Sequence, residues 1–132
     1  MAKALSRVAP IIWSDLDPAL SPDLHGALTL DLNVAAVAGS IDNIVRTSPG
    51  ERVFLPTFAL GLRNFLFEPV NSNLMNRFAK QIKDSVETWD PRVAVAGVDF
   101  KTDPDNNLVS LTVRFNIAGY TQTFSTTSAV TQ

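Results

Sequence analysis

The chain has 132 residues, of which 45% are hydrophobic, and a formal net charge of −2, so it has the size and apolar content of one domain with a core. It has no cysteine and a single histidine, His25, which excludes disulfides, thiolate metal sites, cysteine nucleophiles and multi-histidine metal sites. The slightly acidic balance excludes the electrostatic footprint of a nucleic-acid or anionic-membrane binder, and no stretch approaches the ~20 apolar residues of a membrane span.

Residues 1–32 have the composition of an extended arm. Pro10, Pro18, Pro22 and Gly26 interrupt the segment every few residues, which disfavours long helices or strands. Its apolar residues are sufficient for docking, either onto its own domain or onto a partner chain, and the sequence leaves both open. Residues 28–32 alternate between apolar and polar side chains, which favours a short strand.

Three helices are predicted, near residues 34–47, 59–67 and 73–89. Apolar residues recur at helical spacing in each, and the third pattern is the longest and most regular. Asn33 is expected to cap the first helix through its side chain, and Asn71, Ser72 or Asn73 the third.

The stretch from Thr47 to Glu68 joins the first two helices. A Ser-Pro-Gly turn is expected to present Glu51 and Arg52 on a rigid corner, because proline presets one backbone angle and glycine adopts conformations that other residues avoid. Residues 53–55 are expected to run extended into Pro56.

The remainder predicts a small antiparallel sheet. A strand is expected over residues 92–101 with an irregularity near Ala96-Gly97, and a second over 108–118, where apolar and polar residues alternate strictly. The tail, 120–132, has no charged residue and is rich in threonine and serine, so we expect it to extend, pair and leave an open edge for a partner. The predicted class is α+β: an arm over 1–32 and one domain over 33–132, with three helices followed by the sheet.

Catalysis finds little support in the sequence. A glycosidase would need two carboxylates close together, and the available acids are Glu51, Glu68, Glu87 and Asp90, with no spacing that brings two of them together. His25 has no triad partner at recognisable spacing, and no phosphate-binding glycine loop is present.

The Asp90-Pro91-Arg92 corner carries more information. Residues 90 and 92 point to the same side of an extended segment, so an acid and a guanidinium pair at a junction made rigid by proline. This pair is either a surface salt bridge of little consequence or a preorganised polar knob for another chain.

Four motifs follow one another along the chain: Ser48-Pro49-Gly50-Glu51-Arg52, Pro56-Thr57-Phe58, Leu66-Phe67-Glu68 and Trp89-Asp90-Pro91-Arg92. In this order they resemble the baseplate wedge family of contractile-tailed phages. These are the lysozyme-like wedge or sheath-initiator proteins of T-even-type phages, which are related to a type VI secretion baseplate subunit. Asp90 stands where the family usually has glutamate, and Ala59 where it has glycine.

The resemblance implies assembly without catalysis or cofactor. The corner would contact the helical core bundle of neighbouring wedge subunits, and the C-terminal sheet would template polymerisation of the tail sheath protein by strand addition. It implies a place in the virion, in the tail baseplate, after assembly in the host cytoplasm, and leaves the tail tube open as a further partner. The alternatives are a peptidoglycan-degrading enzyme, a type VI secretion subunit and a generic adaptor domain with no tail role. The predicted partner-binding residues are Glu51, Arg52, Asp90, Pro91, Arg92, Arg114, Tyr120 and Phe124.

Overall fold

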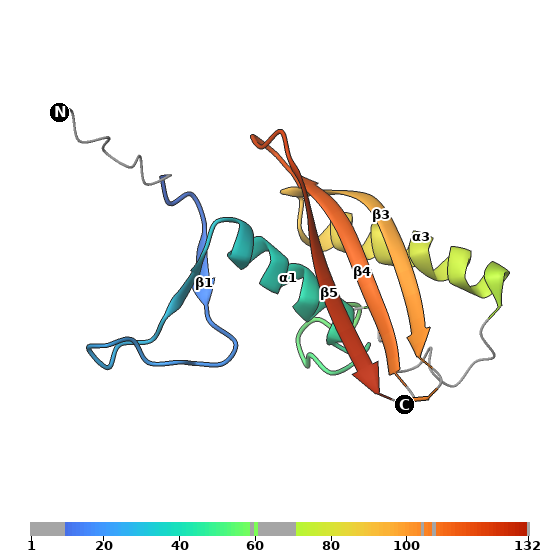
Figure 1. Cartoon of the computed structure of the whole chain (residues 1–132), viewed down its shortest axis with the longest axis horizontal. Helices are drawn as coiled ribbons and strands as arrows, with labels where there is room; N and C mark the ends of the chain where they lie inside the picture. The colour runs from blue at the N-terminus through green and yellow to red at the C-terminus, as the bar shows by residue number, and fades with distance from the viewer. Residues whose placement is uncertain (1–9, 59, 61–70, 104, 107, 132) are drawn as a thin grey trace.

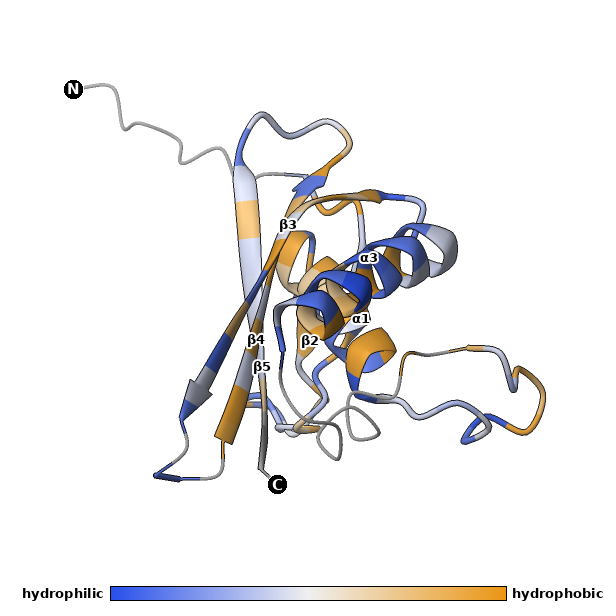
Figure 2. Ribbon diagram, turned by 90° about the vertical axis from the view of Figure 1, so that its right-hand side faces the viewer, coloured by the Kyte–Doolittle hydropathy of each residue, from blue (hydrophilic) through white to orange (hydrophobic). Residues whose placement is uncertain are grey.

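The computed structural model describes residues 10–58, 60, 71–103, 105–106 and 108–131. These residues form an α+β fold in which two helices lie against one face of a three-stranded antiparallel sheet, while a small two-stranded hairpin projects from the body (Figure 1). Figure 2 shows both helices on the same side of the sheet. The α+β prediction is confirmed, and two of the three predicted helices lie in the described residues; the one expected near 59–67 lies outside them.

Both described helices follow from the spacing of their apolar residues. Helix α1 spans Val34–Arg46 and buries one face, and helix α3 spans Ser72–Trp89 and buries Phe78, Ile82 and Val86. Asn71 caps α3, since its side chain accepts a hydrogen bond of 2.8 Å from the Leu74 amide. The bounds predicted from sequence agree to within one residue at each end.

The sheet is built from two consecutive hairpins. Strands β3 (Val93–Asp103), β4 (Leu108–Ile117) and β5 (Thr123–Thr131) pair in chain order, so β4 is central and β3 and β5 form the two edges. The register of β3 against β4 shifts between Val95 and Gly97, which is the predicted bulge.

The core fills the space between the helices and the inner face of the sheet. Alternate residues of β4 point inward and are almost completely buried, as the strict alternation in the sequence indicates. Phe58 and Leu60 join this core from the segment that follows the turn. The fully buried large side chains are Val37, Ile41, Ile44, Val45, Phe78, Ile82, Val86, Leu111, Val113, Phe115 and Ile117.

The N-terminal arm contains more structure than an extended chain. Strands β1 (Ser14–Leu16) and β2 (Leu30–Leu32) pair antiparallel and form a hairpin that extends away from the sheet (Figure 1). The short strand predicted within residues 28–32 is therefore present.

Two local expectations were wrong. Asn33 does not cap α1 through its side chain; its Oδ1 instead accepts from the Ile12 and Trp13 amides at 2.8 and 3.3 Å, and its amide group donates to the Pro10 carbonyl at 3.2 Å. Its φ of 50° lies in the left-handed region, which asparagine tolerates better than most residues. Residues 53–55 are not extended but turn, because the Leu55 amide bonds back to the Arg52 carbonyl at 3.2 Å.

Candidate interaction surfaces

The Asp90-Pro91-Arg92 corner forms where α3 ends and β3 begins. The Asp90 side chain is 2% exposed and accepts two bonds from the guanidinium of Arg92, from Nε at 2.7 Å and from Nη2 at 2.6 Å. The Arg92 backbone amide adds a third bond to the same carboxylate at 3.2 Å. Because the acid is buried, the pair is not the weak surface salt bridge that the sequence left open. The Arg92 side chain remains one-third exposed, at 33%.

Protonation follows from this geometry. Burial alone raises the pKa of Asp90, but hydrogen bonds from Arg92 and from the Ser40 hydroxyl outweigh it, so its pKa lies below the usual 3.8. The hydrogen bond to Asp90 in turn raises the pKa of Arg92, and the charge of Asp15 adds to this effect. Asp90 is therefore ionised at neutral pH, and its bonds to α1 and to Arg92 fix the corner in position.

Aromatic rings continue from the corner toward the sheet. The Arg92 guanidinium lies over Trp13 at 5.6 Å from the ring centroid. The ring centroids of Trp13 and Tyr120 are 6.4 Å apart. Tyr120 meets Phe124 edge to face at 5.7 Å. Three predicted partner-binding residues thus lie in one connected group: Arg92, Tyr120 and Phe124.

Two aromatic side chains, Phe58 and Trp89, connect Arg52 to the Asp90-Pro91-Arg92 corner. Arg52 lies over Phe58 at 4.2 Å, and Phe58 packs edge to face on Trp89 at 5.1 Å, directly before Asp90. Glu51 instead stabilises the turn, where its carboxylate accepts the Ser48 amide at 2.7 Å. Arg52 therefore belongs with the Asp90-Pro91-Arg92 corner, whereas the carboxylate of Glu51 is occupied within its own loop.

Arg114 lies apart from this group. It projects from the solvent face of β4 and pairs with Asp99 on β3, with Nε at 2.8 Å from the carboxylate. Its guanidinium also covers Gly97, where an added Cβ would come within 2.6 Å of Nη2. Both partners are at least half exposed, so the pair contributes little to stability.

The two edges of the sheet differ in chemistry. The β3 edge carries the bulge and three charged residues, Asp99, Lys101 and Asp103. Its Val95 amide donates a hydrogen bond of 3.0 Å to the Glu87 carboxylate of α3. Bulges, charges and covered amides all oppose the addition of a further strand. Strand β5 has no charged residue in its sequence, Thr123–Thr131, and no bulge in its register with β4.

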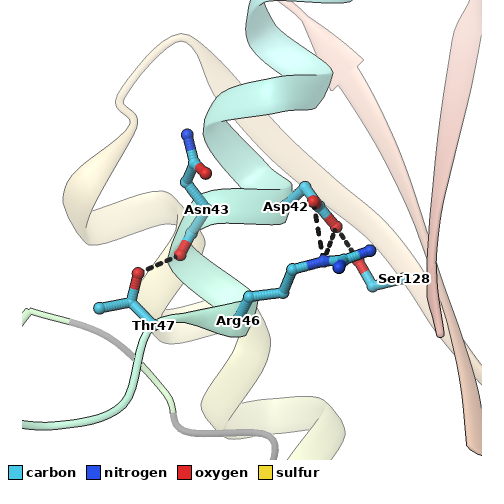
Figure 3. Close-up of polar contacts among 5 residues, drawn as sticks. All are labelled: Asp42, Asn43, Arg46, Thr47 and Ser128. Carbon is cyan, nitrogen blue, oxygen red and sulfur yellow. Dashed lines mark hydrogen bonds and ion pairs between the residues drawn. The ribbon is translucent and has the colours of Figure 1, made fainter. Parts of the chain in front are cut away.

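Strand β5 is fixed to the body from its inner face. Ser128 is 3% exposed and donates a hydrogen bond to Asp42 of α1, which also pairs with Arg46 at 2.9 Å (Figure 3). One turn further along, Thr47 bonds the Asn43 carbonyl at 2.6 Å and ends the helix (Figure 3). The helix thus fixes the edge strand through a buried polar contact as well as through apolar packing.

Sequence reasoning missed several of these contributors. Ser40 and Trp13 bond or stack on the corner from distant segments, and Asp42 meets Ser128 across 86 positions of the chain. No local pattern reports such contacts. Trp13 was the most accessible to prediction, since a tryptophan in a proline-rich arm needs a surface on which to pack.

Two negative findings apply to the described residues alone. Within them no three histidine or acidic side chains gather closely enough to hold a metal ion. The helices of that same part of the chain are too short or too polar to cross a membrane.

Two solved structures share this fold. A crystal structure of a candidate tail lysozyme from Geobacter sulfurreducens superposes with a TM-score of 0.64 at 21% identity, covering 72% of this chain and 86% of that one. The baseplate of the anti-feeding prophage, solved by cryo-EM, contains a chain that matches with a TM-score of 0.62 at 18% identity, covering 89% and 83%. At these identities the likeness extends to the fold alone.

Sequence comparison gives the family. Residues 33–123 match the family model described as baseplate wedge protein gp25, so the chain belongs to that family. It is also 24% identical over 106 residues to baseplate wedge protein gp25 of Enterobacteria phage T4, covering 80% of each chain. The resemblance drawn from the four sequence motifs is confirmed.

Proposed function

We propose that this chain is a structural subunit of a phage tail baseplate wedge, that it binds neighbouring wedge subunits, and that it templates polymerisation of the tail sheath by strand addition. Membership of the baseplate wedge family supports the first part. The observation that carries the mechanism is the contrast between the two sheet edges, one blunted and one free of charge and bulge. The proposed location is the tail baseplate of the virion.

The Asp90-Pro91-Arg92 corner is proposed to bind the helical core bundle of other wedge subunits. Two N–H groups of Arg92 are used on Asp90, which leaves three of the five N–H groups that a guanidinium carries. The buried carboxylate fixes the direction of these donors before any partner arrives, and such preorganisation lowers the entropic cost of binding. Arg52 extends the same surface.

The β5 edge is proposed to accept a strand from the sheath protein. An uncharged edge strand of nine residues offers a row of backbone donors and acceptors, which is the requirement for β-augmentation. The bond between Ser128 and Asp42 would hold the template in place while the strand adds. The tail tube remains a further proposed neighbour.

A peptidoglycan-degrading activity is the alternative, and the structure favours it less. Of the four acids considered, Glu51 is exposed on a turn with its carboxylate bonded to the Ser48 amide, and Glu68 lies outside the described residues. The Glu87 carboxylate accepts the Val95 amide, and that of Asp90 accepts the Arg92 guanidinium. The likeness to a candidate tail lysozyme extends to the fold alone. A zymogram on purified cell wall tests this alternative, and lysis abolished by Glu51→Gln would favour it.

Lysine substitution at the two edges tests strand addition. Ser125→Lys/Thr127→Lys places two charges on the solvent face of β5, and Ala94→Lys/Ala96→Lys places the same charges on β3. Charged side chains oppose pairing at an edge strand. In virions assembled with each variant, negative-stain imaging should show baseplates without sheath for the β5 variant and normal sheaths for the β3 variant. Full-length sheaths on particles with the β5 variant would contradict the proposal.

A further inference from the structure

The β1–β2 hairpin exposes an apolar face that nothing in the described residues covers. Leu30 and Leu32 alternate along β2 and therefore share a face, and Leu16 lies directly opposite Leu30 on that same face. Leu28 continues the alternation two residues before the strand, where it forms an isolated bridge with Pro22. Their exposed fractions are 52% for Leu16, 51% for Leu28, 54% for Leu30 and 39% for Leu32. We call these four side chains the leucine face.

The hairpin keeps its shape through polar bonds in place of a core. The Asp17 carboxylate accepts the amides of Ala19 and Ser21 at 2.9 and 3.3 Å, and Asp23 accepts those of His25 and Ala27 at 2.7 and 2.9 Å. An isolated two-stranded hairpin is at best marginally stable in water, so these bonds to backbone amides add to the few bonds between its strands. The leucines are 39–54% exposed and contribute no buried core to the hairpin.

The charge of the hairpin is one-sided. Residues 10–32 contain four aspartates and no lysine or arginine, whereas residues 33–132 contain nine basic and nine acidic residues. Asp15 and Asp31 are directly opposite each other across the two strands, on the face behind the leucines. Like charges in that position destabilise a strand pair. A cation from another chain would relieve this repulsion at Asp31.

We propose that the leucine face of the hairpin docks into an apolar groove of a partner protein whose rim carries lysine or arginine. The charge selects this partner: a second hairpin of the same sequence brings four further aspartates, and nucleic acids or anionic membranes bring phosphates, so all three are repelled. The inference does not depend on the wedge or sheath contacts proposed above, which involve other residues.

Binding by the full-length protein can be tested with two designed helical-hairpin peptides, in each of which an apolar groove lies between the two helices. Both carry the same leucine stripe, and the rim is lysine in one and glutamate in the other. In a fluorescence anisotropy titration the lysine-rimmed peptide should bind at least about tenfold more tightly than the glutamate-rimmed one. Added salt should weaken its binding, because attraction between the lysines and the aspartates distinguishes the two peptides. Equal binding of the two peptides, or binding of neither, would overturn the proposal.

Substitutions identify the face and the acids. Leu16→Ser/Leu30→Ser should abolish binding of the lysine-rimmed peptide, whereas Phe54→Ser removes an apolar side chain that is 96% exposed elsewhere and should leave it unchanged. Asp31→Asn should weaken binding about fivefold or more and at the same time slow amide hydrogen exchange in the hairpin, since it removes the repulsion between Asp31 and Asp15 and keeps the charge of Asp15 near Arg92.

Weaker binding together with slower amide exchange distinguishes a role in recognition from a role in holding the hairpin together. If Asp31→Asn weakens binding only by loosening the hairpin, amide exchange will accelerate, and Asp31 has no recognition role. Sedimentation of the wild-type protein provides the last check. A dimer that Leu16→Ser/Leu30→Ser dissociates would show that the face pairs with a second copy, and the proposal would then be wrong.

Discussion

Removal of the Arg92 guanidinium tests how the corner is built. Arg92→Ala leaves the Asp90 carboxylate, which is 2% exposed, without the two bonds of 2.7 and 2.6 Å that it now accepts. The Ser40 hydroxyl and the backbone amide of residue 92 remain as donors. The buried charge is therefore only partly compensated.

The loss in the free energy of unfolding caused by Arg92→Ala lies between two known limits. Breaking a fully buried ion pair by removing one partner costs about 3–5 kcal/mol, whereas an exposed pair is worth about 0–1 kcal/mol. Because Arg92 is one-third exposed and Asp90 keeps two donors, we expect a loss of about 2–3 kcal/mol. Since domains are stable by about 5–15 kcal/mol, the variant should remain folded but melt roughly 10 °C lower.

Urea denaturation of four proteins isolates the pair: wild type, Arg92→Ala, Asp90→Asn and the double variant. In the double variant no buried charge is left without its partner, so the two losses should not add, and the coupling energy should be at least about 1.5 kcal/mol. Arg92→Lys is the matched control, because it keeps the charge but cannot form the two-pronged contact. Additive losses, or an Arg92→Ala variant within about 0.5 kcal/mol of wild type, would refute the reasoning.

Three further predictions concern the same contacts. The pKa of Asp90 is lowered by folding, so its ionised form contributes to the free energy of unfolding above about pH 4, and this contribution is lost as the pH falls through the pKa of the folded state. Asp90→Asn should therefore flatten the fall of that free energy below about pH 4. An unchanged fall in the variant would contradict this prediction. Asn33→Gly relieves the left-handed backbone but removes the side-chain bonds to the arm, so amide exchange in residues 13–32 should accelerate while that of α1 does not. Ser128→Ala should cost about 1 kcal/mol and accelerate exchange in β5, whereas the exposed Ser125→Ala should change neither; equal effects would exclude the role of the buried hydroxyl.

Elements whose pattern is local were predicted well. The apolar spacing of α3 and the strict alternation in β4 are repeated over many residues, so each sequence window carries the same signal. The bulge near Gly97 was also predictable, because glycine inside a strand marks an irregularity. For the site, Asp90-Pro91-Arg92 could be found because its partners are two residues apart.

Contacts between distant segments could not be predicted in the same way. Asparagine is a residue type that often caps helices, but the side chain of Asn33 forms three hydrogen bonds with the N-terminal arm instead of with α1. These bonds depend on the tertiary fold. Val53 and Phe54 read as an extended run, yet hydrogen bonds across the loop fold them into a turn at which both are exposed. That Asp90 would be buried was likewise invisible, because Ser40 and Trp13 cover the corner from other elements.

Imaging of virus particles that lack this chain tests the central claim most directly, namely that it acts as a building block at the base of the tail. Negative-stain micrographs of a knockout should show tails without sheath, and expression of the wild-type chain in trans should restore the sheath. Normal sheathed tails assembled in the complete absence of the chain would contradict the account.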